Sequence, residues 1–122
     1  MNLPFEKLTI NDTEYKLKIS AATAVEIEKK LGKSLIDGLH DFDKVEIVTL
    51  YLWGALQKFQ GNVSMATVYE VYDDYIDAGG SMSDMAEVLL NTLTVSGFFK
   101  RQQMEKLLTL AKKAESAERP QS

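Results

Sequence analysis

The sequence has no cysteine, a single histidine and no apolar run long enough to cross a membrane. The absence of cysteine excludes disulfide bonds, thiolate metal ligands and cysteine nucleophiles. We expect His40 to be structural, because acid–base catalysis needs a partner that orients the imidazole. The N-terminus, MNLPFEKL, lacks a basic start followed by an apolar run, so we expect no signal peptide. These features favour a single cytoplasmic domain of 122 residues with no membrane partner.

Motifs that carry chemistry are also missing. The sequence contains no glycine-rich phosphate loop, no HExxH and no strand-to-helix nucleotide fingerprint. Asp73, Asp74 and Asp77 form an acidic cluster, but they lack the spacing and glycine of a calcium loop. We expect a solvated acidic helix face there. The sequence therefore predicts a non-enzymatic protein without a metal or cofactor.

Charge is divided unevenly along the chain. From Lys100 onward there are six basic and three acidic residues, a net charge of +3, whereas the first 99 residues have a net charge of −7. The overall charge of −4 argues against a nucleic-acid binder, which would need a basic surface. The basic end could fold back on the acidic body, face an acidic partner or form a solvated helix with no partner.

The most apolar stretch, Val45 to Phe59, predicts a central buried helix. One stripe follows helical spacing through Val45, Val48, Leu52, Ala55, Leu56 and Phe59. The narrow remaining face holds Glu46, Thr49, Trp53 and Gln57. Trp53 is either half-buried under a neighbouring element or an aromatic contact for a partner. We expect Asp41 or Asp43 to cap this helix and Gly61 to end it.

The residues before the central helix predict a β-hairpin and two helical segments. Alternating apolar residues over 5–19, with Asn11-Asp12 between them, indicate the hairpin. Ser20 should cap a helix over 21–31 that ends at Gly32, and a single helical turn should end at Gly38.

Three further helices are predicted after the central one. Ser64 starts a helix whose inner face is formed by Met65, Val68, Tyr69, Tyr72, Tyr75 and Ile76. Gly79-Gly80 separates it from a helix capped by Ser81 or Ser83, and a final amphipathic helix runs over 99–113. The predicted fold is α+β and mostly α, with an N-terminal β-hairpin packed on a bundle of about five helices. We expect one domain over 1–113 and a disordered tail over 114–122.

Several segments together resemble the tail assembly chaperones of long-tailed phages and prophages of Gram-positive bacteria. The resemblance covers about residues 6 to 101 and lies in the segments EYKLKIS, AATAVEIEKKLGKSLIDGL, LYLWGALQKFQGNVSMATVYEVYDDYIDAGG and VSGFFK. Its most specific parts are the helix end at Glu26, Glu28, Lys29, Lys30, Leu31, Gly32 and Lys33, the core at Trp53, Ala55, Leu56 and Gln57, the acidic helix ending at Gly79, and Ser96-Gly97-Phe98-Phe99. None of these motifs is catalytic. The final helix matches least.

The resemblance implies a protein that binds the long, helical and aggregation-prone tape measure protein in the host bacterial cytoplasm. Such chaperones are displaced when the tail tube protein polymerises round the tape measure. The alternative is a structural virion component, such as a head–tail connector or tail terminator protein.

A chaperone of this kind needs exposed apolar side chains that repack around a helix. The candidate partner-binding residues are Trp53, Phe98, Phe99, Met104, Leu107, Leu108 and Ala111. The stripe on the last helix, from Met104 to Ala111, could instead complete the core or be buried between copies in a homo-oligomer.

Overall fold

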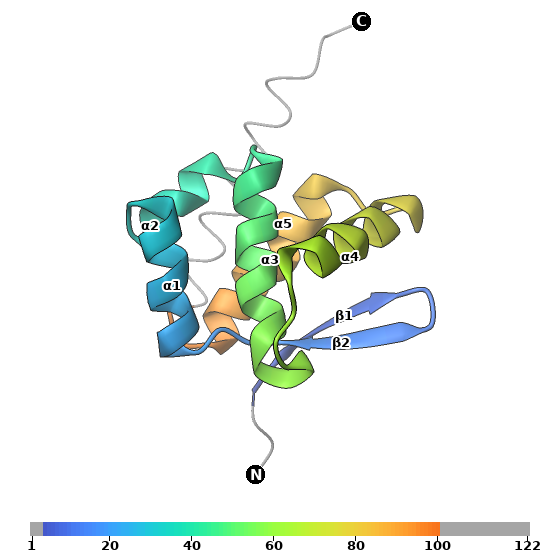
Figure 1. The fold of residues 1–122 in the computed structure, drawn as a ribbon, viewed down its shortest axis with the longest axis horizontal. Helices are drawn as coiled ribbons and strands as arrows, with labels where there is room; N and C mark the ends of the chain where they lie inside the picture. Colours follow the sequence, from blue (N-terminus) through green and yellow to red (C-terminus); the bar gives the residue numbers. More distant parts are fainter. Residues whose placement is uncertain (1–3, 101–122) are drawn as a thin grey trace, which may run out of the picture.

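The computed structural model describes residues 4–100, which form an antiparallel β-hairpin followed by helices, an α+β fold that is mostly α (Figure 1). The hairpin consists of β1 (Glu6–Ile10) and β2 (Thr13–Leu17). The helices are α1 (Ala21–Leu31), α2 (Leu35–Gly38), the 3-10 turn η1 (Leu39–Asp41), α3 (Val45–Gln60), α4 (Met65–Asp77) and α5 (Met82–Val95). The predicted fold class and element order are confirmed. The predicted helix over 99–113 and tail over 114–122 fall almost entirely outside the described residues.

The hairpin follows the predicted alternation of side chains. Leu8 pairs with Tyr15 and Ile10 with Thr13, so one set of apolar side chains points toward the helices. Leu8, Ile10 and Leu17 are buried there. Asn11 has a φ of 53°, the left-handed conformation that a tight turn requires and that asparagine tolerates.

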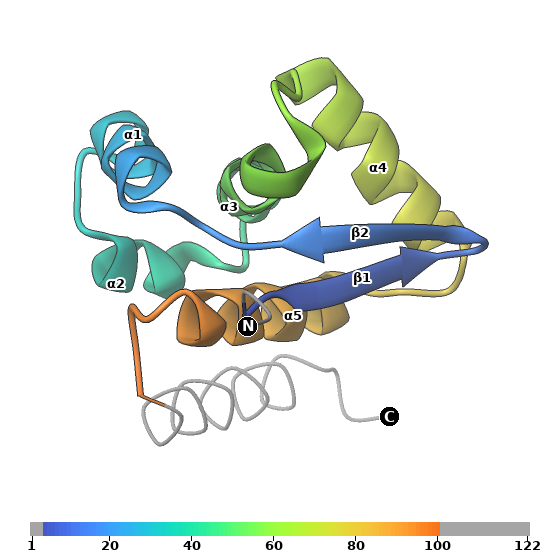
Figure 2. The same cartoon turned by 90° about the horizontal axis from the view of Figure 1, so that it is seen from below.

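Helix α3 lies at the centre, with α1 and α2 on one side and α4 on the other (Figure 1). Figure 2 shows the hairpin between α3 and α4 on one side and α5 on the other. The Lys18 amide donates to the Ala55 carbonyl at 3.0 Å, and the Gln60 side chain bonds both backbone groups of Lys16. These bonds hold the open side of β2 along the C-terminal half of α3.

Close approach of α1 to α3 depends on one glycine. A Cβ on Gly54 would collide with the Ile27 side chain and crowd Thr23, both on α1. Glycine at this position therefore lets Ile27, which is fully buried, lie directly on the backbone of α3.

Helix caps follow the serine pattern of the sequence. Ser20, Ser34, Ser64 and Ser81 each accept from the amide three residues later. Ser81 is the cap of α5, where the Asp84 carboxylate also accepts from the Ser81 amide and completes a capping box.

The predicted cap of α3 is wrong. Lys44 precedes the first residue and gives no side-chain bond, and Asp41 instead uses its carboxylate to bind Lys33 and Lys44. The amides of Ile47 and Val48 donate to the Lys44 carbonyl at 3.1 Å, and the first two residues of the helix, Val45 and Glu46, are exposed.

Burial also corrects four positions. Val45, expected in the buried stripe, is 52% exposed at the first position of α3. Thr49, expected on the polar strip, is fully buried, and its hydroxyl is satisfied by donating to the Val45 carbonyl at 2.7 Å. Tyr69 and Ile76 point outward from α4, and Val71 is buried instead.

Tyr51 ties α3 to α2. Its hydroxyl donates to the Leu35 carbonyl at 2.6 Å, and its ring meets Phe42 edge-on with centroids 4.7 Å apart. Burial, followed by the charges of Glu28 and Asp41, raises the pKa of Tyr51, so the hydroxyl stays protonated and remains a donor.

Replacing Tyr51 by Phe tests this bond. Tyr51→Phe leaves the buried Leu35 carbonyl without its donor, and we expect the free energy of unfolding to fall by about 1–3 kcal/mol. Urea unfolding followed by circular dichroism measures the change. A Tyr15→Phe variant, altered on the half-buried hairpin strand, should unfold like the parent. A Tyr51→Phe variant as stable as the parent would contradict the assignment.

Candidate functional site

Trp53, the first of the predicted partner-binding residues, is half-buried on α3. The Lys30 ammonium of α1 lies over its ring, 4.6 Å from the centroid. A cation over an aromatic face is an attractive contact that also covers the ring. The structure thus matches the expectation that a neighbouring element covers Trp53.

The two phenylalanines after α5 differ in position. Phe99 is 7% exposed and belongs to the core, so it is not the exposed contact we expected. Apolar side chains of the core bury Phe99, whereas we had expected a partner to cover it. Phe98 is half-buried, and its amide donates to the Leu93 carbonyl at 2.9 Å. The other four candidates, Met104, Leu107, Leu108 and Ala111, lie outside the described residues.

Phe98 instead takes part in a groove between α1 and α2. Two adjoining shallow hollows, the larger of them wide open to solvent, share Val25, Glu28 and Ser34, and their volumes are about 290 and 420 Å³. We call them together the α1–α2 groove. Its lining is Ala21, Ala24, Val25, Glu28, Lys29, Lys33, Ser34, Leu35, Ile36 and Phe98.

Two large apolar side chains stand open in this groove. Val25 is 49% exposed and Ile36 is 50% exposed, although neither is at an end of the chain. Covering such apolar side chains with a partner is favourable, because it removes apolar surface from water. The groove therefore offers apolar area at one end and the charged groups of Glu28, Lys29 and Lys33 at the other.

The link between α1 and α2 fixes the shape of the groove. Gly32 adopts the left-handed conformation, with φ of 72°, and turns the chain at the end of α1. The Glu28 carboxylate then accepts from the Leu35 amide at 3.0 Å, which holds the start of α2 beside α1. Ser34 caps α2, and Leu35 is buried against the core, so Ile36 must point outward.

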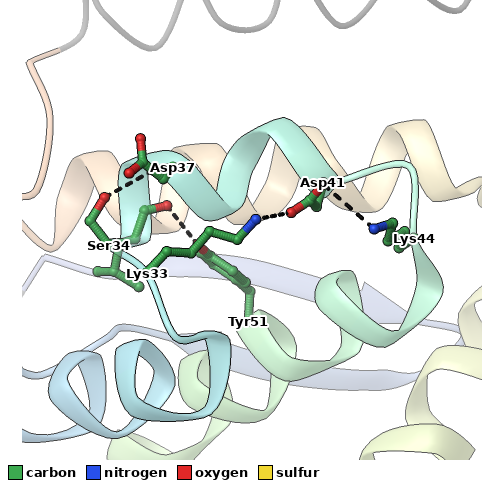
Figure 3. Close-up of polar contacts among 7 residues, drawn as sticks. Lys33, Ser34, Asp37, Asp41, Lys44 and Tyr51 are labelled. Carbon is green, nitrogen blue, oxygen red and sulfur yellow. Dashed lines mark hydrogen bonds and ion pairs between the residues drawn. The ribbon is translucent and has the colours of Figure 1, made fainter.

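Figure 3 shows the side chains of Lys33 and Lys44 pointing toward Asp41. The Lys33 ammonium binds the Asp41 carboxylate, and the Lys44 ammonium lies 3.7 Å from the other oxygen. The hydrogen bond from Lys33 is the main reason that the pKa of Asp41 lies below its ordinary value, with burial acting in the opposite direction. Asp41 thereby holds Lys33 at one edge of the groove.

The arrangement has the chemistry of a contact surface. Among residues 4–100, no three histidine, aspartate or glutamate side chains gather closely enough to bind a metal ion. His40 is exposed, beyond the groove. Glu28 and the two groove lysines can fix the orientation of a partner at one end, while apolar contact supplies its affinity.

Sequence reasoning singled out neither Ile36 nor Val25. The available signal for Ile36 was its position next to Leu35 in a four-residue helix. Successive residues of a helix point about 100° apart, so both could not face the same core. Nothing in the sequence indicates that α2 leaves Val25 exposed.

Removing the Lys33 ammonium tests the contact that holds this edge of the groove. In Lys33→Met we expect the pKa of Asp41 to rise toward its ordinary value, because its main hydrogen-bond donor is lost, while the Lys44 charge still lowers it in part. A pKa that is lowered in the folded state stabilises the protein at pH values above the ordinary pKa. This contribution is lost as the pH falls through the folded-state pKa. NMR titration of the side-chain carboxyl groups measures the pKa of Asp41.

Lys29→Met is the matched control for this titration. Lys29 also lines the groove, but it belongs to none of the ion pairs among residues 4–100. The pKa of Asp41 should stay the same in that variant. An equal rise in both variants would mean that Lys33 acts only through general charge.

Comparison with known proteins identifies a family for this chain. In the part of the chain described, no helix has the length and apolar character needed to cross a membrane. No curated protein and no solved structure matches the chain. The model of a family of unknown function, DUF6096, matches residues 5–119. Because this match spans most of the sequence, the chain belongs to the DUF6096 family.

Proposed function

We propose that this protein is a tail assembly chaperone of a long-tailed phage or prophage. It binds the tape measure protein in the host bacterial cytoplasm, keeps it soluble, and is displaced when the tail tube protein polymerises. The role needs an apolar surface for a helix and needs no bond-breaking chemistry.

The α1–α2 groove is the observation that carries the proposal. Two of the motifs on which the resemblance rests lie about 65 residues apart in the sequence and meet in this groove. The helix end supplies Glu28, Lys29 and Lys33, and the Ser96–Phe99 motif supplies Phe98. Core packing accounts for Phe99, which is buried, and for Leu31, which is partly buried against the core. It does not account for the exposed side chains of Val25 and Ile36 beside them.

The energetics fit a reversible partner. Val25 and Ile36 are each about half exposed, so covering them contributes about 1 kcal/mol apiece. Phe98 and the walls of the groove add further apolar area. Contacts of this size hold a helix without making a complex too stable for a polymerising tail tube to displace.

Co-expression with a tape measure protein encoded beside this chain tests the function. We expect the tape measure protein to move from the insoluble to the soluble fraction and to co-purify with this chain. Mature particles should lack this chain, because a chaperone leaves before assembly ends. Its presence in purified particles would instead favour a connector or terminator protein, and an unchanged solubility would contradict a chaperone.

Charge substitutions in the groove test the surface. Val25→Asp with Ile36→Asp should abolish co-purification, because a partner would have to bury two carboxylates in an apolar contact. Val45→Asp is the matched control, since Val45 is 52% exposed on α3 and lines neither hollow. Both proteins should keep the parent circular dichroism spectrum. Equal loss of binding in the control would remove the groove from the proposal.

A further inference from the structure

Most of helix α5 has no exposed side. From Met85 to Ser96, every position is buried or half-buried. Other helices of the protein keep an open side, where Val25 on α1 and Tyr69 and Ile76 on α4 are exposed. A helix that packs on one side keeps its other side in water, whereas a helix covered around its circumference has neighbours on both sides. The burial of α5 therefore indicates a neighbour on each side of it.

The described neighbours of α5 lie on one side of it. Within residues 4–100, the elements that pack extensively on α5 are α3 and β1. Figure 2 shows both of them on the same side of α5, and Figure 1 places α5 behind α3. Met85, Leu89 and Leu93 are fully buried in the core on this side. In Figure 2, no helix or strand of residues 4–100 lies on the opposite side of α5.

Three residues on that opposite side are half-buried. Glu87, Asn91 and Val95 follow one another at spacings of four, so they form one row along α5. Successive residues of a helix point about 100° apart, so Asn91 points about 160° away from both Leu89 and Leu93. We call these three residues the outer row of α5. The elements α3 and β1 lie on the other side of the helix, so they do not supply the cover of Asn91 and Val95.

The chain leaves α5 from a fixed point beside the outer row. The Gly97 amide donates to the Thr94 carbonyl at 3.0 Å, and the Phe98 amide donates to the Leu93 carbonyl at 2.9 Å. With Gly97 in the left-handed conformation, at a φ of 91°, these two bonds form a Schellman motif that ends the helix. Phe99 is then buried in the core. The residues that follow therefore start at the C-terminal end of α5.

The sequence beyond residue 100 contains an apolar stripe that fits the outer row. Four apolar residues follow helical spacing there, namely Met104, Leu107, Leu108 and Ala111. A helix over 101–113 is about 20 Å long, which is also the length of α5. Two helices joined by a short loop pack antiparallel. Such an arrangement places Met104 opposite Val95 and, one helical turn further, Leu108 opposite Asn91.

Charge favours the same arrangement. Residues 101–113 include four basic residues and one acidic residue, a net charge of +3. The two charged residues of α5, Asp84 and Glu87, are both acidic and stand near its start. In the antiparallel order, Lys112 falls opposite Glu87, and Lys113 lies beside the same end of α5. Opposite charges therefore meet at the end of α5 that is far from the connecting loop.

We propose that residues 101–113 dock antiparallel on the outer row of α5 and cover it with the stripe from Met104 to Ala111. The occupant of this surface is thus a segment of the same chain. The stripe is then unavailable to a tape measure helix, which leaves the α1–α2 groove as the surface for that partner. The docking does not rest on the proposed function, because it is a contact within one molecule.

Engineered cysteine pairs test the docking in the full-length protein, which has no cysteine of its own. In Asn91→Cys with Leu108→Cys, the two side chains face each other, so mild oxidation should form a disulfide within one molecule. The control pair is Asn91→Cys with Thr109→Cys, because Thr109 lies off the stripe and should stay reduced under the same conditions. Mass spectrometry and non-reducing electrophoresis measure both reactions. Equal behaviour of the two pairs would overturn the proposal, and so would a cross-linked dimer, which would identify a second copy as the occupant.

The reactivity of a single cysteine gives a second readout. Leu108→Asp should raise the rate at which a thiol reagent labels Asn91→Cys by about fivefold, because a carboxylate in the stripe disfavours the apolar contact and uncovers the outer row. Thr109→Asp adds the same charge off the stripe and should leave the rate unchanged. Equal rates in both variants would contradict the docking.

Two controls keep these measurements decisive. Circular dichroism should show the parent spectrum for Leu108→Asp, and if this variant does not fold, the two cysteine pairs still decide the outcome. Both measurements use the chain alone, without a tape measure protein. A failure of the co-expression experiment therefore leaves them independent.

Discussion

The burial of α3 is the constraint on which the rest of the structure depends. Its consecutive residues Val48 to Leu52 are all buried, as are Gly54, Ala55 and Leu56. A helix buried around most of its circumference needs a neighbour on each side. The strand β2 and the helices α1, α4 and α5 supply those neighbours, and each must turn its own most apolar side inward. This requirement determines which side chains of these elements remain exposed for a partner.

Helix α1 illustrates the consequence. Ile27 and Ala24 face the core, and Gly54 allows Ile27 to lie against the backbone of α3. Val25 then lies outside that contact, where α2 approaches without covering it. The approach of α2 is itself fixed by the Tyr51 hydroxyl on Leu35 and by the Glu28 carboxylate on the same residue. The groove is therefore an outcome of core packing and local caps acting together.

The sequence predicts the elements well because their signals are local. Serine caps, the left-handed Gly32 and the alternation in the hairpin each depend on a few neighbouring residues, and all are observed. Errors occur where a tertiary contact decides. Thr49 looks polar, but its hydroxyl bonds within the helix and lets it be buried. Tyr69 and Phe99 show the reverse difficulty, because an apolar residue can face out or in according to a neighbour that periodicity does not identify.

The candidate site was less predictable than the fold for the same reason. Trp53 and Phe98 stand out in the sequence as isolated aromatic residues, yet Lys30 covers one and the groove exposes part of the other. Val25 and Ile36 are ordinary apolar residues whose exposure depends on how closely two helices approach.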